Sequence, residues 1–476
     1  MTTSAWLCAA GVGLFSVWLG RSEVQEVAPL PPPNGPGILN SSHELRNCSG
    51  EPCNAVFRGL LAFFDRELGG LAANGRACAD CHMATDSFQL SPVNVEARFQ
   101  RLRERRRLDP TADDPLFRPI DADDFRINGA RASDFSNLRQ NGLIRVTFTL
   151  PPNIRLVDPA TNAVSAETIV DVWRSVPTVN DLALTGPDRG TPWTRGPNDT
   201  GGYQWDARVA TLPDQARAAL ANHAQARRAP PQQILDDLSS FQRVLFSNER
   251  VRALSRAIQT GTVSLPDPDP DHRLTPLERK GKAVFERACV QCHGGPGQST
   301  PQATVRSPPA PVVRFHSIAT QCPRPVDVAT PARFAFVACP PQLARNARTY
   351  EIALSMPTQT PGGLLPAGTR VRRTSSDPGR ALLTGFVGGG PAQDDWDKFD
   401  MPGLRGISRT APYFHNNSAA TLEEVVDHYD ELFKRAEANF LPGAVVPPIA
   451  TTDGVHFDRR PSVDERDALL AYLRKL

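Results

Sequence analysis

The chain has 476 residues, too many for one compact hydrophobic core, and its length predicts two to three domains. Its 53 lysines and arginines nearly balance its 51 aspartates and glutamates, and the formal charge of +2 argues against a protein that binds nucleic acid or a membrane surface. The arginine-rich run at residues 98–107 is therefore interpreted as the solvated face of a helix, with docking of an acidic partner as the alternative.

The N-terminal segment predicts export. Residues 5–20 are an apolar run of signal-peptide length, followed by polar residues and a proline-rich linker. No basic residues precede the run and no clear small-residue cleavage site follows it, so cleavage and anchoring both stay open. We expect residues 1–38 to be a signal peptide or N-terminal anchor plus linker, and the protein to be periplasmic or exported. No later segment is apolar for long enough to span a bilayer.

The cysteines fall into distinct groups. Of the nine, Cys8 lies in the export segment and four belong to two C-x-x-C motifs. The remainder, Cys48 with Cys53 and Cys322 with Cys339, suits two short-loop disulfides in an oxidising compartment. Four free buried thiols are the alternative.

Two motifs predict the cofactor. CADCH at residues 78–82 and CVQCH at residues 289–293 each match the attachment pattern of a c-type haem. Two thiols must reach the two vinyl groups of one porphyrin, and the next residue must point its imidazole at the iron from the same side. A thioredoxin-like redox pair or a zinc site is the alternative, but a redox pair does not need the following histidine twice, and a zinc site would need its two cysteine pairs closer together. We expect two covalently attached haem c groups, with attachment at Cys78, Cys81, Cys289 and Cys292 and iron ligation by His82 and His293.

Helix signals surround both motifs. An apolar-faced helix is predicted over residues 56–68, before the first motif, and Thr275 with Glu278 forms a capping box that opens a helix before the second. A third box, from Ser462 to Glu465, opens a helix near the C-terminus. The predicted fold is mainly α, with two cytochrome c-like haem domains packed together over residues 39–262 and 263–476. The proline-rich stretch at about residues 300–373 is expected to be an insertion in the second domain.

Three segments resemble the bacterial di-haem cytochrome c peroxidase and MauG superfamily. These are NGRACADCH (residues 74–82), QWDARVATLPDQARAALANHAQ (residues 204–225) and MPGLRGISRTAPYFHNNSAATLEEVVDHY (residues 401–429). The resemblance covers most of the chain after the linker, and the last segment is the most specific. It implies an oxidoreductase with a catalytic first haem and an electron-transfer second haem, served by a small electron-donor protein such as a cytochrome or cupredoxin.

The resemblance also implies roles for residues near the first haem. Trp205 matches the tryptophan that passes electrons between the haems, with a buried structural tryptophan as the alternative. Gln215 matches a distal glutamine. The next family position, an acid–base glutamate, is Gln225 here, and an amide cannot take up or return a proton. His223 could substitute because imidazole titrates near neutrality, unless it is only a solvated helix residue.

The two irons are expected to differ in coordination. No histidine occurs between His82 and His223, so the first iron has no candidate for the family's removable ligand and is expected to be open. For the second iron, the family's ligand position falls on Tyr429. The capping box from Thr421 to Glu424 sets a helix phase that turns Tyr429 inward and leaves His428 at the edge of the apolar face. A core tyrosine, or ligation by Met401, is the alternative.

A calcium ion is a further implication of the resemblance. The family holds calcium between its haems through backbone oxygens that match Thr410 and Pro412, together with an asparagine side chain. The register leaves either Asn180 or Asp181 as that acceptor, and oxygen ligands in a loop suit calcium.

The leading functional prediction is reduction of hydrogen peroxide, with electrons relayed from the second haem to the open first haem. Tyr429 and the missing glutamate favour an alternative, in which high-valent iron or bound oxygen oxidises an organic or protein substrate, as in MauG or rubber oxygenases. A non-catalytic di-haem electron carrier is the third hypothesis. The expected partners are peroxide or oxygen and an electron-donor protein, without nucleic acid, and a membrane only if the N-terminal segment is retained.

Overall fold

The computed structural model describes a large part of the chain beginning at Cys48. The described residues are 48–122, 124–127, 130–133, 135–186, 202–290, 292–299, 315–316, 343, 345–360, 362–390, 393–438, 449–450, 456–457 and 460–476. They fall within one compact unit that begins at His43, and the predicted boundary at residues 262–263 stays a prediction. The export segment, Cys322 and Cys339 lie outside the described residues.

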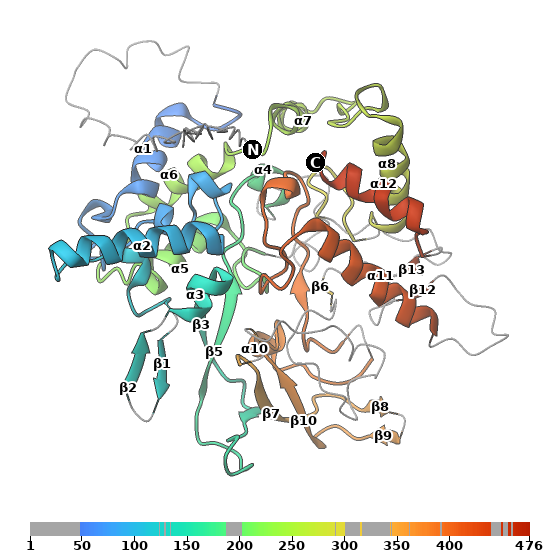
Figure 1. The fold of residues 1–476 in the computed structure, drawn as a ribbon. Coiled ribbons are helices and arrows are strands. Elements are labelled where there is room, and N and C mark those ends of the chain that lie inside the picture. The colour runs from blue at the N-terminus through green and yellow to red at the C-terminus, as the bar shows by residue number, and fades with distance from the viewer. Residues whose placement is uncertain are drawn as a thin grey trace, which may run out of the picture. The chain divides into compact units, whose positions relative to one another are not determined.

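Two helix pairs are built in the same way. α1 (Cys53–Phe64) crosses α6 (Gln232–Arg243), and α8 (Pro276–Ala288) crosses α12 (Val463–Leu473), as Figure 1 shows. A Cβ atom on Gly59 of α1 would lie 1.9 Å from the backbone oxygen of Asp237, and one on Gly281 of α8 would lie 1.9 Å from that of Ala468. Glycine is therefore required at both crossings, because any side chain would separate the helices.

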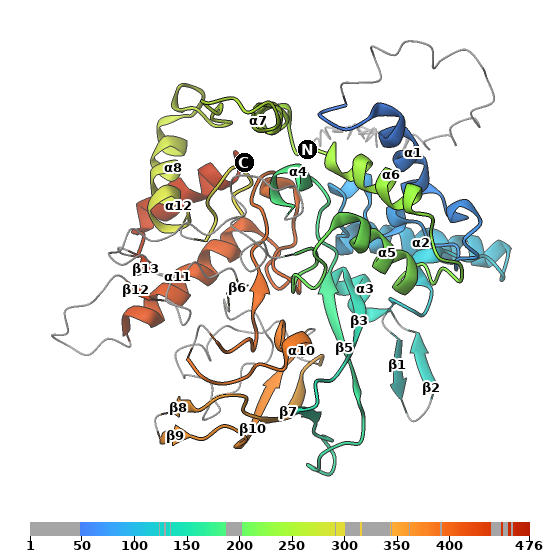
Figure 2. The ribbon, with the colours of Figure 1, turned by 180° about the vertical axis from the view of Figure 1, so that it is seen from behind.

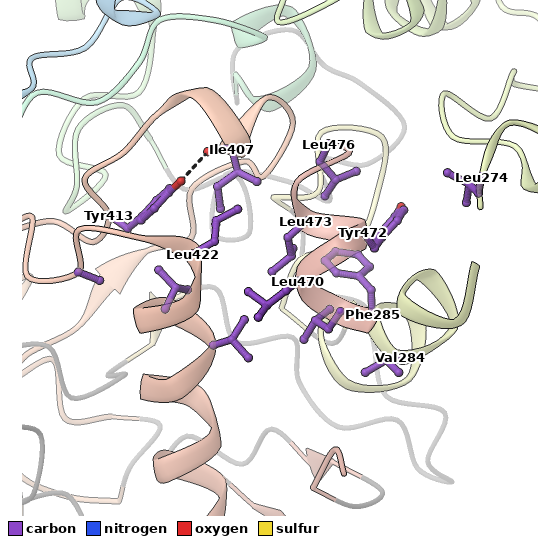
Figure 3. Packing of buried hydrophobic residues seen from close by; sticks show 14 residues of the cluster. Leu274, Val284, Phe285, Ile407, Tyr413, Leu422, Leu470, Tyr472, Leu473 and Leu476 are labelled. Atoms are coloured by element: carbon purple, nitrogen blue, oxygen red, sulfur yellow. Dashed lines mark hydrogen bonds between the residues drawn. The ribbon is translucent and has the colours of Figure 1, made fainter. Parts of the chain in front are cut away.

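Aromatic contacts complete each pair. The rings of Phe63 and Phe241 lie 5.2 Å apart, and those of Phe285 and Tyr472 lie 5.5 Å apart, both edge to face. Figure 3 shows Phe285 and Tyr472 within the apolar cluster of the second pair. In the same cluster, the Tyr413 hydroxyl donates a hydrogen bond to the backbone oxygen of Ile407 at 3.1 Å. Each pair thus joins a helix before a C-x-x-C-H motif to a helix late in the same predicted domain, and the two haem domains stay a prediction.

Local signals predicted from the sequence are present. The Thr275 hydroxyl accepts from the Glu278 amide at 3.2 Å, and the Glu278 carboxylate accepts from the Thr275 amide at 2.7 Å, which confirms the box that starts α8. The box at Ser462 is confirmed in the same way for α12. Cys48 and Cys53 form the predicted disulfide, which starts α1 three residues earlier than expected.

The remaining helices and strands complete the described fold. The other helices are α2 (Pro92–Leu108), α3 (Ser136–Asn141), α4 (Leu182–Thr185), α5 (Leu212–Asn222), α7 (Glu249–Gln259), α10 (Ala381–Thr384) and α11 (Leu422–Ala438). The two-stranded antiparallel pairs are β1 (Asp124–Ile127) with β2 (Ala130–Ser133), β3 (Leu143–Thr149) with β5 (Ile169–Ser175), β6 (Phe315–His316) with β11 (Phe399–Asp400), β8 (Thr358–Thr360) with β9 (Gly363–Leu365), and β12 (Ile449–Ala450) with β13 (His456–Phe457). None of the described helices is long and apolar enough to cross a membrane.

A sheet joins distant parts of the chain. β7 (Arg348–Ala353) pairs with β10 (Arg370–Ser375) on one side and with β4 (Ile154–Leu156) on the other, and both pairings are antiparallel. Figures 1 and 2 show β7 and β10 side by side. The later part of the expected insertion therefore pairs with the first half of the chain. Residue patterning did not indicate this, because the partner strand β4 is only three residues long.

Helix α2 corrects one sequence interpretation. Its residues Arg101, Arg103 and 105–107 are exposed, as predicted for a solvated face. Arg98 is instead buried, where its guanidinium donates to Asp114 at 2.8 Å and to Asp80 at 2.5 Å. Asp80 lies inside the first C-x-x-C-H motif, so α2 braces that motif.

Two further segments repeat one local structure. Tyr203 bridges to Val209 and Tyr413 bridges to Ala419, each across a tight loop. Two residues after each bridge, a threonine caps a helix: Thr211 accepts from the Asp214 amide at 3.2 Å before α5, and Thr421 accepts from the Glu424 amide at 3.3 Å before α11. Helices α5 and α11 are therefore equivalent elements of the two halves.

Candidate haem site

One cavity of about 450 Å³ brings together most of the residues predicted from the sequence. Both C-x-x-C-H motifs contribute to its wall, although they are more than two hundred residues apart in sequence. The predicted residues that line it are Cys78, Cys81, His82, Asn180, Trp205, Gln215, His223, Cys289, Cys292, His293, Thr410, Pro412 and Tyr429. Gln225 is the predicted site residue that does not line it.

The two motif histidines are oriented alike. The His82 amide donates to the Cys78 backbone oxygen at 2.9 Å, and the His293 amide donates to that of Cys289 at 2.8 Å, so both motifs form the same tight turn. His82 Nδ1 lies 3.0 Å from the Phe88 backbone oxygen, and His293 Nδ1 lies 3.1 Å from that of Gln298. A carbonyl can only accept, so Nδ1 carries the hydrogen and Nε2 carries the lone pair, as in metal-ligating histidines.

Burial gives the site residues the protonation that a haem protein needs. Burial, with a smaller contribution from nearby His223, lowers the pKa of His82 to about 4, so its imidazole is neutral near pH 7. Burial raises the pKa of Cys78, Cys81 and Cys289 to about 12, and these cysteines carry no disulfide. Neutral ring nitrogens and paired thiols around one apolar cavity fit two covalently attached haem groups.

The first motif is held by buried charge. Asp80 accepts from Arg66 at 2.7 Å and from Arg98 at 2.5 Å, and its carboxylate also accepts from the Ala77 amide. Burial alone would raise the pKa of Asp80, but these hydrogen bonds and charges outweigh it and the pKa is lowered. These contacts fix the turn that carries both thiols.

Trp205 lies against both halves of the chain. Its indole nitrogen donates to the Ser175 backbone oxygen of β5 at 2.9 Å, and its own backbone oxygen accepts from the Asp400 amide of β11 at 2.8 Å. The side chain is half-buried and lines the cavity with both motifs. The predicted place of Trp205 between two haems stays a prediction.

A buried ion network follows Trp205. Asp206 accepts from Arg174 and, at 2.8 Å, from Arg208, while Arg174 also binds Asp377 in a two-pronged contact at 2.6 and 3.0 Å. Burial alone would raise the pKa of Asp206, but the two arginines outweigh it and the pKa is lowered. This network ties the tryptophan loop to β5 and to the residues after β10.

Replacing Asp206 by asparagine should lower the free energy of unfolding by about 3–5 kcal/mol at neutral pH, because Arg174 would keep its charge in a buried place without one of its anions. The lowered pKa means that this contribution is present above the ordinary aspartate range near pH 4 and is lost as the pH falls through the folded-state value. The measurement is urea unfolding at several pH values, with Asp214→Asn, which changes an exposed ion pair with Arg217, as the matched control. Equal losses in the two variants would contradict the expected role.

Two of the three residues predicted to act near the first haem lie in the cavity, and one does not. Gln215 on α5 and His223 at its C-terminal end both line the cavity. Gln225 is exposed, and its side-chain oxygen accepts from Asn74 at 3.2 Å outside the cavity. Gln225 adopts a left-handed φ of 51°, which turns the chain away after His223. Gln225 matches the family's glutamate position by residue count, but its side chain lies outside the cavity where an acid–base group could act.

Two residues near His223 were missed from the sequence. Asp121 accepts from His223 Nδ1 at 2.8 Å, and Arg76 donates to the other oxygen of Asp121 at 2.5 Å. No motif pointed to Asp121. Arg76 lies inside the segment of residues 74–82, two positions before Cys78, but its burial among backbone oxygens is visible only in three dimensions.

Tyr429 faces the cavity and its neighbour His428 does not, as the helix phase predicted. Tyr429 lines the cavity, and burial raises the pKa of its phenol, with a further contribution from the nearby Cys292 and Cys289. His428 is half-buried but does not line the cavity, and its ring lies 4.8 Å from that of Phe414. Met401 is buried and also lines the cavity, so it stays an alternative ligand.

The equivalence of α5 and α11 identifies the counterpart of Tyr429. Tyr429 stands eight positions after the capping threonine of α11, and Ala219 stands eight positions after the capping threonine of α5. Ala219 also lines the cavity. The second half thus presents a phenol where the first half presents a methyl group.

The residues expected near a calcium ion also meet the cavity. The side-chain amide nitrogen of Asn180 donates to the Ser87 backbone oxygen at 3.2 Å. Asp181 is 2% exposed, and one of its carboxylate oxygens accepts from the Ser247 amide at 2.9 Å while the other has no hydrogen-bond partner. Burial raises the pKa of Asp181 to about 6. Of the two side chains expected near a calcium ion, Asp181 is the one with a buried oxygen that lacks a hydrogen-bond partner.

No protein-family model and no curated protein matches the sequence. Among solved structures, a MauG-like protein associated with microbial copper homeostasis is similar at a TM-score of 0.40 and 18% identity, over 89% of this chain and 88% of that chain. The diheme peroxidase BthA from Burkholderia thailandensis E264 is similar at a TM-score of 0.38 and 16% identity, over 90% of this chain and 88% of that chain. Both names belong to the class that the motifs resemble. Hydrazine synthase from Kuenenia stuttgartiensis is similar at a TM-score of 0.29 and 16% identity, over 75% and 84%. Similarity at these low values carries no argument about activity, so the functional case rests on the residues of this chain.

Proposed function

We propose that the protein is an exported di-haem c-type oxidoreductase of the di-haem peroxidase and MauG superfamily, and that it reduces hydrogen peroxide at an open first haem. The observation that carries this proposal is the shared cavity, in which both C-x-x-C-H motifs meet Trp205 and Tyr429 on α11 stands at the position that Ala219 occupies on α5. His82 is then the single protein ligand of the first iron, and His293 with Tyr429 holds the second.

The haem groups, when bound, supply one-electron transfer and, at an iron with an open position, peroxide activation. Reduction of one peroxide to two water molecules consumes two electrons and two protons. A reduced donor protein would supply the electrons, and a haem held by His293 and Tyr429 would receive them. Trp205 lines the space between the motifs and is the side chain that we assign to electron passage. His223 is the cavity residue that we assign to proton transfer, in the place of the family's glutamate.

The ferric protein provides the first test. Electron paramagnetic resonance and optical spectra should show one high-spin and one low-spin haem, because an open iron is high-spin and an iron with two protein ligands is low-spin. Two low-spin haems would overturn the enzyme proposal and favour a di-haem electron carrier.

A second candidate function is oxidation of an organic or protein substrate. Tyr429 favours it, because tyrosine is the second-haem ligand that the resemblance associates with MauG-like proteins. Steady-state consumption of peroxide with a reduced electron donor distinguishes the two. Rapid turnover supports the peroxidase, whereas slow turnover in protein with a normal high-spin first haem supports substrate oxidation.

His223→Ala should lower peroxide turnover by about 10²- to 10⁴-fold, the usual contribution of a general acid–base group. Gln225→Glu should leave turnover within about twofold of wild type, because that side chain lies outside the cavity and cannot reach a reacting group. The measurement is the initial rate at saturating donor. A steep rise in Gln225→Glu would instead mean that the loop after α5 turns inward in the working enzyme.

We also propose that Asp181, with the backbone oxygens of Thr410 and Pro412, holds a calcium ion. Support comes from the buried carboxylate oxygen without a partner, since a buried charge is costly unless a cation compensates it. Wild type and Asn180→Ala should retain calcium after exhaustive dialysis, and Asp181→Ala should lose it. Retention by Asp181→Ala would reject this ligand.

The proposed compartment and partners follow from the same chemistry. The Cys48–Cys53 disulfide supports an oxidising compartment, which agrees with export to the periplasm or beyond. The proposed electron donor is a small cytochrome or cupredoxin. Fractionation of the producing cells tests the compartment.

A further inference from the structure

Three side chains form a chain of contacts beside the first motif. His223 Nδ1 lies 2.8 Å from one oxygen of Asp121, and Arg76 Nη1 lies 2.5 Å from the other. The Asp121 and Arg76 side chains are 5% and 2% exposed, whereas that of His223 is 27% exposed. Arg76 and His223 line the same cavity as His82.

We propose that Asp121, held by Arg76, is a positioning residue that fixes the tautomer of His223 and thereby makes it competent as the acid–base group. This inference rests on the proposed function. A carboxylate paired with a guanidinium carries no proton and can only accept, so the hydrogen of the neutral ring must lie on Nδ1. The lone pair then lies on Nε2, the nitrogen left for a reactant in the cavity that His223 lines.

The backbone of His223 is held as firmly as its ring. Its carbonyl oxygen accepts from Arg76 at 2.9 Å and from the Asn74 side chain at 3.0 Å. Arg76 donates in addition to the backbone oxygens of Pro115 and Arg118, so its guanidinium has no freedom to follow a moving carboxylate. The charged groups that hydrogen-bond to His223 are Asp121 at its ring and Arg76 at its carbonyl oxygen, and together they fix its orientation.

This arrangement also connects the cavity to water. His223 is partly exposed at the surface and lines the cavity at the same time, whereas Asp121 and Arg76 are sealed from solvent. The two protons that peroxide reduction consumes can enter through His223 one at a time. A ring that delivers protons in this way must return to one tautomer after each transfer, which a fixed carboxylate ensures.

The test is Asp121→Asn, with carbon monoxide as a probe of the ferrous protein. An amide can donate to Nδ1, which moves the ring hydrogen to Nε2 and turns an acceptor in the cavity into a donor. At about pH 8, where a free histidine is neutral, the C–O stretch of the adduct should fall to lower frequency in the variant, because a donor now faces the bound gas. Turnover should fall by about 10²- to 10⁴-fold in kcat with little change in KM, the pattern of a wrong tautomer. Asp113→Asn removes the same charge from a surface pair with Arg118 and should change neither measurement.

The outcomes separate this inference from the function on which it rests. Identical C–O bands in wild type and Asp121→Asn would overturn the positioning role. Absence of any carbon monoxide adduct would overturn the open first haem, and this inference with it. If Asp121→Asn does not fold because Arg76 loses its anion, the wild type is compared with His223→Ala at about pH 8. The C–O stretch should differ between the two, because the lone pair on Nε2 no longer faces the bound gas in the variant. Identical bands would overturn the proposal.

Discussion

Tyr429→Phe should convert the second haem from low-spin to high-spin, because the substitution removes only the phenol oxygen that we assign as its sixth ligand. The helix phase set by Thr421 turns this side chain into the cavity, where it lies near Cys289 and Cys292. The ferric protein would then show two high-spin signals in place of one. The second iron would lose its sixth ligand completely, so we expect this substitution to have the largest spectral effect in the second half.

His428→Phe is the matched control. It alters the neighbouring residue, which is half-buried and lies outside the cavity, so the low-spin signal should stay. A low-spin signal that survives in Tyr429→Phe would transfer the ligand role to Met401 or His428 and weaken the case for MauG-like chemistry.

Ala219→Tyr should have the opposite effect on the first haem. Ala219 occupies the position on α5 that Tyr429 occupies on α11, and it lines the cavity. A phenol introduced there should reach the open iron, convert it to low-spin and abolish peroxide turnover. The measurements are the ferric spectra and the initial rate with a reduced donor.

Ala219→Phe separates ligation from crowding. It adds nearly the same volume without an oxygen, so it should slow turnover but leave the first haem high-spin. If Ala219→Tyr stays high-spin while it retains both haems, the equivalence of the two helices does not extend to their distance from iron.

The sequence predicted what depends on short-range chemistry. Cys-x-x-Cys-His spacing, the capping boxes at Thr275 and Ser462, and the phase of Tyr429 each follow from contacts within a few residues. The structure agrees with these predictions where it describes the residues. The family resemblance added Trp205 and Gln215, and both line the cavity.

Other features depend on distant residues that a single sequence does not connect. Asp121 meets His223 across 102 positions, and β4 meets β7 although each strand alone carries a weak pattern. Arg98 appeared to belong to a solvated run because its two aspartate partners lie outside α2. Gln225 was assigned by counting from the family motif, and its left-handed backbone conformation removed it from the cavity.

The two glycine crossings also bear on the order in which the chain can fold. Arg58 on α1 pairs with Asp237 on α6 across 179 positions, and Arg287 at the end of α8 pairs with Glu465 on α12 across 178. Each pair closes a long loop, which is slow because the chain entropy of closure is lost before the contacts form. The two loops do not overlap in sequence. The first pair can therefore close while the second half is still being synthesised, and the second pair can close only after α12 has emerged.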